Sequence, residues 1–204
     1  AAIAASVLIQ TSNALQTQAK KTGSDTIKEV SIGVNILDVC GQYGTRIVNG
    51  SSVSRIHNMT ITITPRAGSK EIDLFATHIV ITDGSSEFVL KTNESLPVIA
   101  DSTVPASIFE KVPQSHPDLS TVFDLPSGEY GIIILKDYDG SCTENSPAIN
   151  RGDKIMLTVN LTALFGGVPQ RTNVWGRVVT EEGAQGIFNF RTPAGYQDII
   201  IDLQ

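Results

Sequence analysis

Residues 1–19 read AAIAASVLIQTSNALQTQA, a stretch without a charged residue, a glycine or a proline. Ala, Leu and Gln are good helix formers, so we expect a helix that is apolar on every side at its start. Further along, apolar residues recur at offsets of three and four and predict one stripe on the same helix: Ile27, Val30, Val34 and Leu37. Gly41 and Gly44 then offer a stop. The pattern predicts one long helix over residues 2–40.

This helix needs a partner, because a helix that is apolar all round is not stable alone in water. Three environments would bury it: the core of its own domain, a membrane, or neighbouring copies of the chain. The run 1–9 is too short to span a bilayer, which takes about 20 apolar residues. Its small residues favour close packing between helices. The side chains expected to form the contact are Ile3, Val7, Leu8, Leu15, Ile27, Val30, Val34 and Leu37.

From residue 45 onward the periodicity changes to two. In HNMTITIT, residues 57–64, Met59, Ile61 and Ile63 alternate with polar residues, as in a half-buried strand. Similar runs, separated by Gly, Pro and Asp turns, occupy 72–82, 87–91, 130–136, 154–160, 172–180, 186–191 and 197–203. The apolar last strand is expected at the centre of its sheet. Residues 93–126 hold five prolines and predict a long loop region with one short strand near 103–109.

Strands without interleaved helices predict an antiparallel sandwich or barrel. The expected fold class is therefore α+β, with a long N-terminal helix (1–42) followed by an Ig-like β-sandwich or barrel head (45–204).

The composition narrows the function classes. In 204 residues, 15 basic and 21 acidic side chains give a net charge of −6, with 41% hydrophobic residues and a mean hydropathy of +0.05. A packed core is therefore expected, and the absence of a basic cluster argues against nucleic acid, whose phosphates are bound by Lys and Arg. Cys40 and Cys142 form no zinc motif, and two free thiols are favoured over one disulfide.

The motifs of the common enzyme classes are absent. The sequence contains no GxSxG, HExxH, P-loop or GxGxxG. His57 and His78 fall in expected strands, and His116 lies between two prolines. Nothing in their spacing supports a catalytic triad, although such triads are spatial. We expect no catalytic residue and no enzyme activity.

One acidic loop has a chemically specific pattern. Asp137 and Asp139 flank Tyr138 before Gly140, and Asn150 and Asp153 follow. Alternating carboxylates before a glycine suit a hard cation with oxygen ligands, although the loop is not an EF-hand. The alternative is an Asp-rich turn whose carboxylates accept backbone hydrogen bonds. The candidate ligands are Asp137, Asp139, Asn150 and Asp153, and calcium or magnesium is the one cofactor expected.

Four N-x-[ST] sequons are present, at Asn49, Asn58, Asn93 and Asn160. Such sequons are acceptors for N-glycans in secreted proteins. Asn93, in the expected loop region, is the best of the four candidates, whereas Asn58 lies inside an expected strand.

Both ends of the chain resemble archaeal flagellins, the archaellins. The first match is AASVLIQTSNALQTQAKKTGSDT (residues 4–26), followed by VSIGVNILDVCGQYG (30–44). The second is at the C-terminal end, in INRGD (149–153), PQRT (169–172), GRVV (176–179) and the closing DLQ (202–204). The resemblance covers about residues 1–66 and 130–204, and the middle carries no family signal. Archaellins begin with a longer apolar segment, so this chain is expected to lack the start of that segment.

The resemblance implies a subunit of the archaellum filament, which lies outside the cell and is rotated for swimming. The partners would be copies of this chain and other archaellins, with no nucleic acid and with the membrane contacted only before assembly. It also implies an outward β-sandwich head, N-glycosylation and a metal ion, for which the Asp137–Asp153 loop is the matching segment. Two other functions remain open at this point: a type IV pilin-like adhesin, and a secreted cation-dependent binding module or enzyme.

Overall fold

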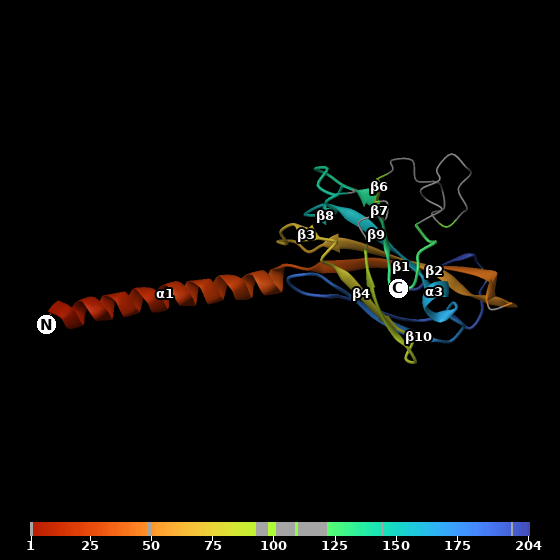
Figure 1. Ribbon diagram of the computed structural model, residues 1–204, viewed down its shortest axis with the longest axis horizontal. Helices are drawn as coiled ribbons and strands as arrows, with labels where there is room; N and C mark the ends of the chain where they lie inside the picture. The colour runs from red at the N-terminus through yellow and green to blue at the C-terminus, as the bar shows by residue number, and fades with distance from the viewer. Residues whose placement is uncertain are drawn as a thin grey trace.

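The computed structural model describes residues 2–48, 50–92, 98–100, 109, 122–143, 145–196 and 198–204, with only the backbone described at 2–5, 8, 27–31, 48, 53 and 98–100. The helix α1 (Ala2–Ser31) leaves a globular head and points away from it, so that the N-terminus lies at one extreme of the molecule (Figure 1). The head contains β1 (Val34–Val48), β2 (Ser51–Pro65), β3 (Ile72–Asp73), β4 (His78–Thr82), β5 (Glu87–Lys91), β6 (Val98–Ala100), β7 (Gly131–Lys136), β8 (Ala148–Ile149), β9 (Lys154–Asn160), α3 (Leu161–Phe165), β10 (Asn173–Val179), β11 (Gly186–Arg191) and β12 (Ile200–Asp202).

Two sheets form the layers of the head. The larger has the order β12-β1-β2-β9-β7-β6 and is antiparallel except for the β6–β7 pair, and the smaller is antiparallel with the order β11-β10-β4-β5. A short β3–β8 pair completes the described strands. The α+β class and the antiparallel head are confirmed. Because the two sheets do not close on each other among the described strands, the head is a sandwich rather than a barrel.

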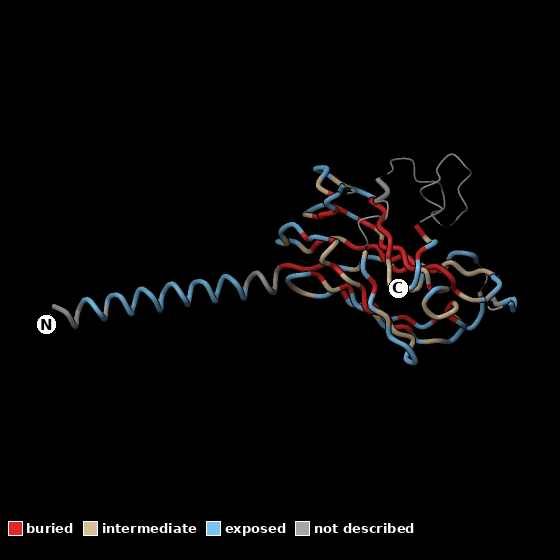
Figure 2. Tube along the Cα trace, in the orientation of Figure 1, coloured by how far each residue is buried: buried red, intermediate tan, exposed pale blue. Residues whose placement is uncertain are grey.

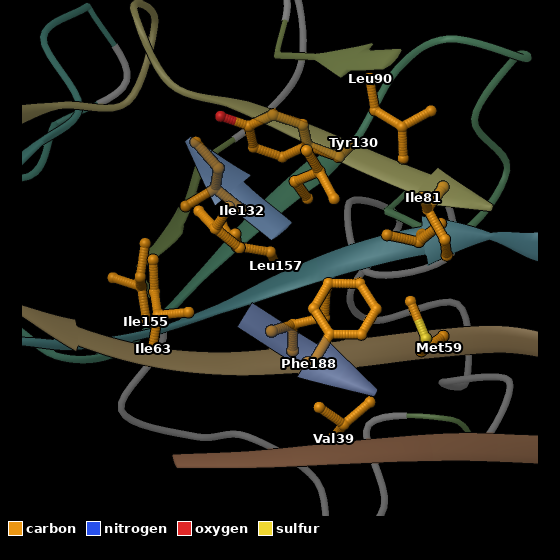
Figure 3. Close-up of a cluster of buried hydrophobic side chains, with 14 of the residues drawn as sticks. Val39, Met59, Ile63, Ile81, Leu90, Tyr130, Ile132, Ile155, Leu157 and Phe188 are labelled. Atoms are coloured by element: carbon orange, nitrogen blue, oxygen red, sulfur yellow. The ribbon is translucent and has the colours of Figure 1, made fainter. Parts of the chain in front are cut away.

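The core lies between the two sheets. Met59, Ile61 and Ile63 of β2 are fully buried, as their alternation with threonine predicts, and Phe188 of β11 is buried opposite them. Figure 3 shows Met59, Ile63 and Phe188 among the apolar side chains that fill the space between the layers. Burial is confined to the head, where the buried segments gather, whereas α1 is exposed along its described surface (Figure 2). The head therefore has a core of its own, to which none of the described side chains of α1 contributes.

The helix ends nine residues before the predicted residue 40, since α1 stops at Ser31 and residues 34–48 form β1. Gly33 has a φ of +148° and ends the helical conformation. Two register shifts in the β1–β2 pairing, the first between Ile36 and Asp38, break the alternation of apolar residues in β1. The predicted boundary of the head at residue 45 is wrong for the same reason, because β1 is its first strand.

The last strand also differs from expectation. Among the described strands β12 pairs with β1 alone, from Cys40 opposite Asp202 to Gln42 opposite Ile200, and lies at the edge of the larger sheet. Ile199 and Ile200 are exposed there, so their apolar character does not mark a central strand. Most of the predicted loop region 93–126 lies outside the described residues, as does the strand expected near 103–109 apart from Phe109, which is in a turn.

Candidate functional sites: the extended helix and the acidic loop

The surface of α1 carries large apolar side chains that are exposed to solvent. The helix has 30 residues and extends about 45 Å at 1.5 Å per residue. Every side chain of α1 that the structure describes is exposed, and Val7 is 54% and Leu15 63% accessible, with Ile9 at 62%. Large apolar side chains exposed this close together on one helix indicate an interaction site. Among the described residues no helix is long and apolar enough to cross a membrane.

The eight predicted contact residues divide into three groups. Val7 and Leu15 lie exposed on α1. The backbone of Ile3, Leu8, Ile27 and Val30 belongs to α1, while their side chains lie outside the described part of the chain. Val34 and Leu37 are in β1, and Val34 is fully buried in the core of the head. The prediction that Val34 and Leu37 belong to a polymerisation helix is therefore wrong, because Gly33 ends the helix before them.

The junction between α1 and the head is held by hydrogen bonds from two loops. Ala184 N donates to Ile32 O over 2.8 Å, and Arg66 N donates to Gly33 O over 2.8 Å. The Ser69 hydroxyl lies 3.1 Å from both the nitrogen and the oxygen of Gly33, accepting from one and donating to the other. A β-carbon at Gly33 would collide with the carbonyl of Ala184. The junction is therefore a close-packed joint.

Sequence reasoning missed this joint. The available signal was the glycine in Ser31-Ile32-Gly33-Val34, since glycine often follows the last turn of a helix. The partners of Gly33 could not have been found from spacing, because Ser69 and Ala184 lie 36 and 151 residues further along the chain.

The acidic loop brings together the three predicted carboxylates. One oxygen each from Asp137, Asp139 and Asp153 lies within 4.8 Å of the others. Asp137 follows β7 and Asp153 precedes β9, and these two strands pair antiparallel, which places the two residues at the same edge. Asp153 is completely buried, whereas Asp139 is exposed. The predicted gathering of these residues is confirmed as geometry.

Backbone amides hold the carboxylates of this loop in place. Asp137 accepts from Gly140 N at 2.8 Å and from Cys142 N at 3.0 Å. Asp153 accepts from Tyr138 N at 3.1 Å and from Asn150 N at 2.9 Å. The structure thus also contains the alternative arrangement, in which the carboxylates accept backbone hydrogen bonds in a turn. Each of these oxygens carries a further lone pair, so the two arrangements are compatible.

Asn150, the fourth predicted ligand, lies beside the exposed carboxylate. Its Nδ2 donates to Asp139 Oδ2 over 2.7 Å and to the Ser141 hydroxyl oxygen over 3.1 Å. The hydrogen bonds from the side chains of Asn150 and Ser141 are the main cause that lowers the pKa of Asp139 below its usual value. Asp139 is therefore held in its charged form next to two other carboxylates.

The two cysteines are free thiols, as expected. Burial is the main cause that raises the pKa of Cys142 to about 12, with Asp137 and Asp153 adding to it. Burial likewise raises the pKa of Cys40 to about 12, and a hydrogen bond to Asp38 at 3.0 Å contributes.

The sequons differ in what the fold allows. Asn58 is only 4% exposed inside β2, so a glycan at this position is incompatible with the folded head and that prediction is corrected. Asn160 caps α3 by accepting from Thr162 N and Ala163 N, and its Nδ2 donates to Leu125 O over 3.0 Å. A glycan on Asn160 would be attached to this same Nδ2. Asn49 and Asn93 lie outside the described residues.

The histidine in β2 has a structural role. His57 is buried, with Nδ1 2.8 Å from the Thr162 hydroxyl and Nε2 3.1 Å from Gly44 O. It therefore links β1, β2 and α3. His116 lies outside the described part of the chain.

A long exposed apolar helix attached to a self-sufficient β-sandwich defines a class of filament subunits in which the helix is available for assembly. The model of the archaeal-type flagellin family matches residues 1–190. The chain belongs to this family, the subunits of the archaellum. It is therefore a structural subunit of an extracellular motility filament, and it assembles with other archaellin subunits.

Relatives and solved structures agree with this assignment. Flagellin B2 of Methanocaldococcus jannaschii is 39% identical over 196 residues, covering 96% of this chain and 82% of the relative. The crystal structure of archaeal flagellin FlaB1 from the same organism has a TM-score of 0.71 and 28% identity, covering 85% of this chain and 97% of that one. The archaeal flagellum of Methanospirillum hungatei strain JF1, at 13% identity and a TM-score of 0.57, shares the fold over 98% of this chain and 89% of that one.

Proposed function

We propose that this chain acts mechanically, as a passive and non-catalytic subunit that polymerises through α1. The exposure of every described side chain of α1, Val7 and Leu15 included, is the observation that carries the proposal. Helices of many copies would bundle into the filament core, and the heads would form its outer shell. The pilin-like adhesin and the secreted enzyme are not favoured, because the whole chain matches archaellins.

The energetics of the helix support this arrangement. Burial of apolar surface stabilises by about 25 cal/mol per Å², and the core of the head includes none of the described side chains of α1. Small residues at the start of the helix, among them Ala2, Ala4 and Ser6, permit close approach of neighbouring helices. Contacts that do not close into a ring then extend the assembly without limit. The first half of α1 lacks charge because its final environment is other helices rather than water.

The helix proposal is tested with Val7→Asp in the full chain, produced in cells that build the filament. We expect filaments to be lost while the head unfolds at its normal temperature, because Val7 contacts no part of the head core. Val7→Ala is the matched control and should assemble normally. Filaments of normal number and length from Val7→Asp would show that this part of α1 is not buried on assembly.

We further propose that the acidic loop binds one divalent cation, calcium or magnesium. The residues fit such an ion, because three carboxylates within 4.8 Å repel one another and present only hard oxygen donors. Asp137, Asp139 and Asp153 would hold the ion. Asn150, whose Nδ2 donates to Asp139, would offer its side-chain oxygen as a further ligand only after its amide turns over. The ion would tie the end of β7 to the start of β9. Its role would be to stiffen the head and not to act in chemistry.

The cation proposal is tested by thermal unfolding with calcium, with magnesium and with chelator. We expect a higher melting temperature with one of the two ions, and Asp139→Asn should remove the difference. Asp83→Asn is the matched control, since Asp83 also accepts backbone hydrogen bonds in a turn, from Ser85 N and Ser86 N, but lies outside the cluster. Identical melting curves of the unmodified chain in all three conditions would refute binding.

A further inference from the structure

The hairpin of β1 and β2 extends beyond the sheet to which it belongs. Both strands have 15 residues, but β12 pairs with β1 only up to Gln42 and β9 pairs with β2 only from Asn58 onward. Residues 45–54, the arm, pair only with each other within the described chain, from Thr45 opposite Ser54 to Val48 opposite Ser51. Figure 1 shows the arm as an orange ribbon on the side of the head away from α1.

The base of the arm is fixed on the head, and the strands of the arm pair only with each other within the described chain. At the base, the rings of Tyr43 and Tyr196 have centroids 4.2 Å apart, and Ile56 forms a bridge with Val168. Toward the tip, Ile47 is 79% exposed, the highest fraction among the large apolar side chains of the described head except Tyr138. A two-stranded ribbon that packs on nothing is only marginally stable in water. An extended ribbon with an exposed isoleucine is therefore a surface suited to a partner.

The charge of the arm selects the kind of partner. No acidic residue occurs between Asp38 and Glu71, so the arm and its base carry only the positive charges of Arg46 and Arg55. Arg55 is occupied within the head, where it lies 3.4 Å from Gly166 O and Gly167 O. Arg46 is exposed but leans back toward its own head, with Asp124 as its charged neighbour and its guanidinium 3.0 Å from the side-chain amide of Asn58. Docking would exchange these contacts for the carboxylates of a partner. The partner surface should be acidic and should have room for a side chain.

Such a surface lies at the opposite end of the head, beside the base of α1. A cavity of about 110 Å³ is lined there by Ile32 and by the charged residues Lys70, Glu71, Asp73, Glu181 and Glu182. Four carboxylates against one lysine give it a net charge of −3. Its volume is well below the roughly 300–1,000 Å³ of small-molecule sites. We call it the helix-base cavity.

The geometry points to docking of the arm of one copy at the helix-base cavity of a second copy. Arg46 and Ile47 follow each other in β1 and point to opposite faces of the ribbon, so Arg46 would face Glu181 and Glu182 while Ile47 would be covered by the surface beside the cavity. The arm and the cavity lie at opposite ends of one head, so the contact is head-to-tail and repeats along the direction of α1. The inference rests on the proposed polymerisation through α1 and adds the contact by which successive heads would be held in line. Opposite charges would also select the register between heads.

Charge exchange in the full chain tests the docking, with filaments examined by electron microscopy. All variants carry Ser51→Ala, which removes the sequon of Asn49, because a glycan at the turn of the arm would compete with docking. Arg46→Glu and Glu182→Lys should each shorten filaments severely, since like charges at an interface weaken it by about 100-fold or more. The double variant should restore them. Arg191→Glu, the same charge change on β11, is the control and should leave filaments unchanged.

A second variant excludes a folding artefact. Ile47→Ser alters no charge and no residue of the core, so it should leave the melting temperature of the head unchanged while shortening filaments. Normal filaments from Ile47→Ser or Arg46→Glu, or a double variant that folds but does not recover, would overturn the inference. Normal filaments combined with a loss of surface attachment would also overturn it and assign the arm to a foreign partner. Val7→Asp reports on the helix core alone, so failure of the two proposals can be told apart.

Discussion

Charged substitutions at Val34 and Val7 should have opposite consequences, although both valines are N-terminal and both were expected on one helix. Val34 is fully buried, and its side chain lies against Gly186, where a β-carbon would come within 3.1 Å of it. Replacing a buried valine forfeits about 1.5–3 kcal/mol of burial. An unpaired buried carboxylate costs several kcal/mol more. The sum, about 5 kcal/mol or more, approaches the whole stability of a typical domain, about 5–15 kcal/mol.

We therefore expect Val34→Asp to unfold the head and Val7→Asp to change its free energy of unfolding by no more than about 0.5 kcal/mol. Urea unfolding of the full chain followed by the fluorescence of Trp175, the one tryptophan of the sequence, measures both. Val34→Ala should fall between them, and it controls for the loss of volume without charge. A Val34→Asp head with the urea midpoint of the unmodified chain would refute the assignment of Val34 to the core and restore the longer helix.

Three further changes test the head. Tyr130→Phe removes a buried hydroxyl that donates to two backbone carbonyls and should cost about 1–3 kcal/mol in urea unfolding; an unchanged midpoint would contradict the role of those bonds. The pKa of Asp139 is lowered, chiefly by Asn150, so its stabilising effect is present above the ordinary aspartate pKa and is lost as the pH falls through the lowered value. With chelator present, the melting temperature of Asp139→Asn should fall less on acidification than that of the unmodified chain. The same dependence of melting temperature on pH in both proteins would contradict this. Gly183→Ala should loosen the α1 joint and speed proteolysis there relative to the control Gly128→Ala. Both glycines have a positive φ, but of the two only Gly183 contacts the joint. Equal rates of proteolysis in the two variants would contradict this role of Gly183.

The sandwich was predictable where the alternation of apolar and polar residues is regular. Met59, Ile61 and Ile63 point to one face because a strand has a side-chain period of two, and all three are buried. The same period of two did not predict β1, because the strand contains register shifts. As a result Leu37 is exposed while Val34 and Val39 are buried. Spacings of three and four between Val30, Val34 and Leu37 then imitated a helix.

The acidic loop was predictable for a different reason. Asp137 and Asp139 are neighbours in sequence, and antiparallel pairing of the flanking strands brings Asp153 to them. What sequence could not indicate is the complete burial of Asp153, since that depends on how the loop folds over the edge of the sheet. The helix-base cavity could not be predicted either, because its carboxylates come from segments more than 100 residues apart that only the fold brings together.

The joint at Gly33 connects the two functions of the chain. The head folds around its own core and α1 needs other copies, so a flexible connection would let the helices form a regular bundle under randomly oriented heads. Hydrogen bonds from Ser69, Arg66 and Ala184 instead fix the direction in which the chain enters β1. Because α1 continues from this joint, the arrangement of helices in the bundle determines how each head is oriented. A head-to-tail contact between the arm and the helix-base cavity requires that all heads have the same orientation. If the joint rotated freely, the arm of one head would not face the cavity of the next.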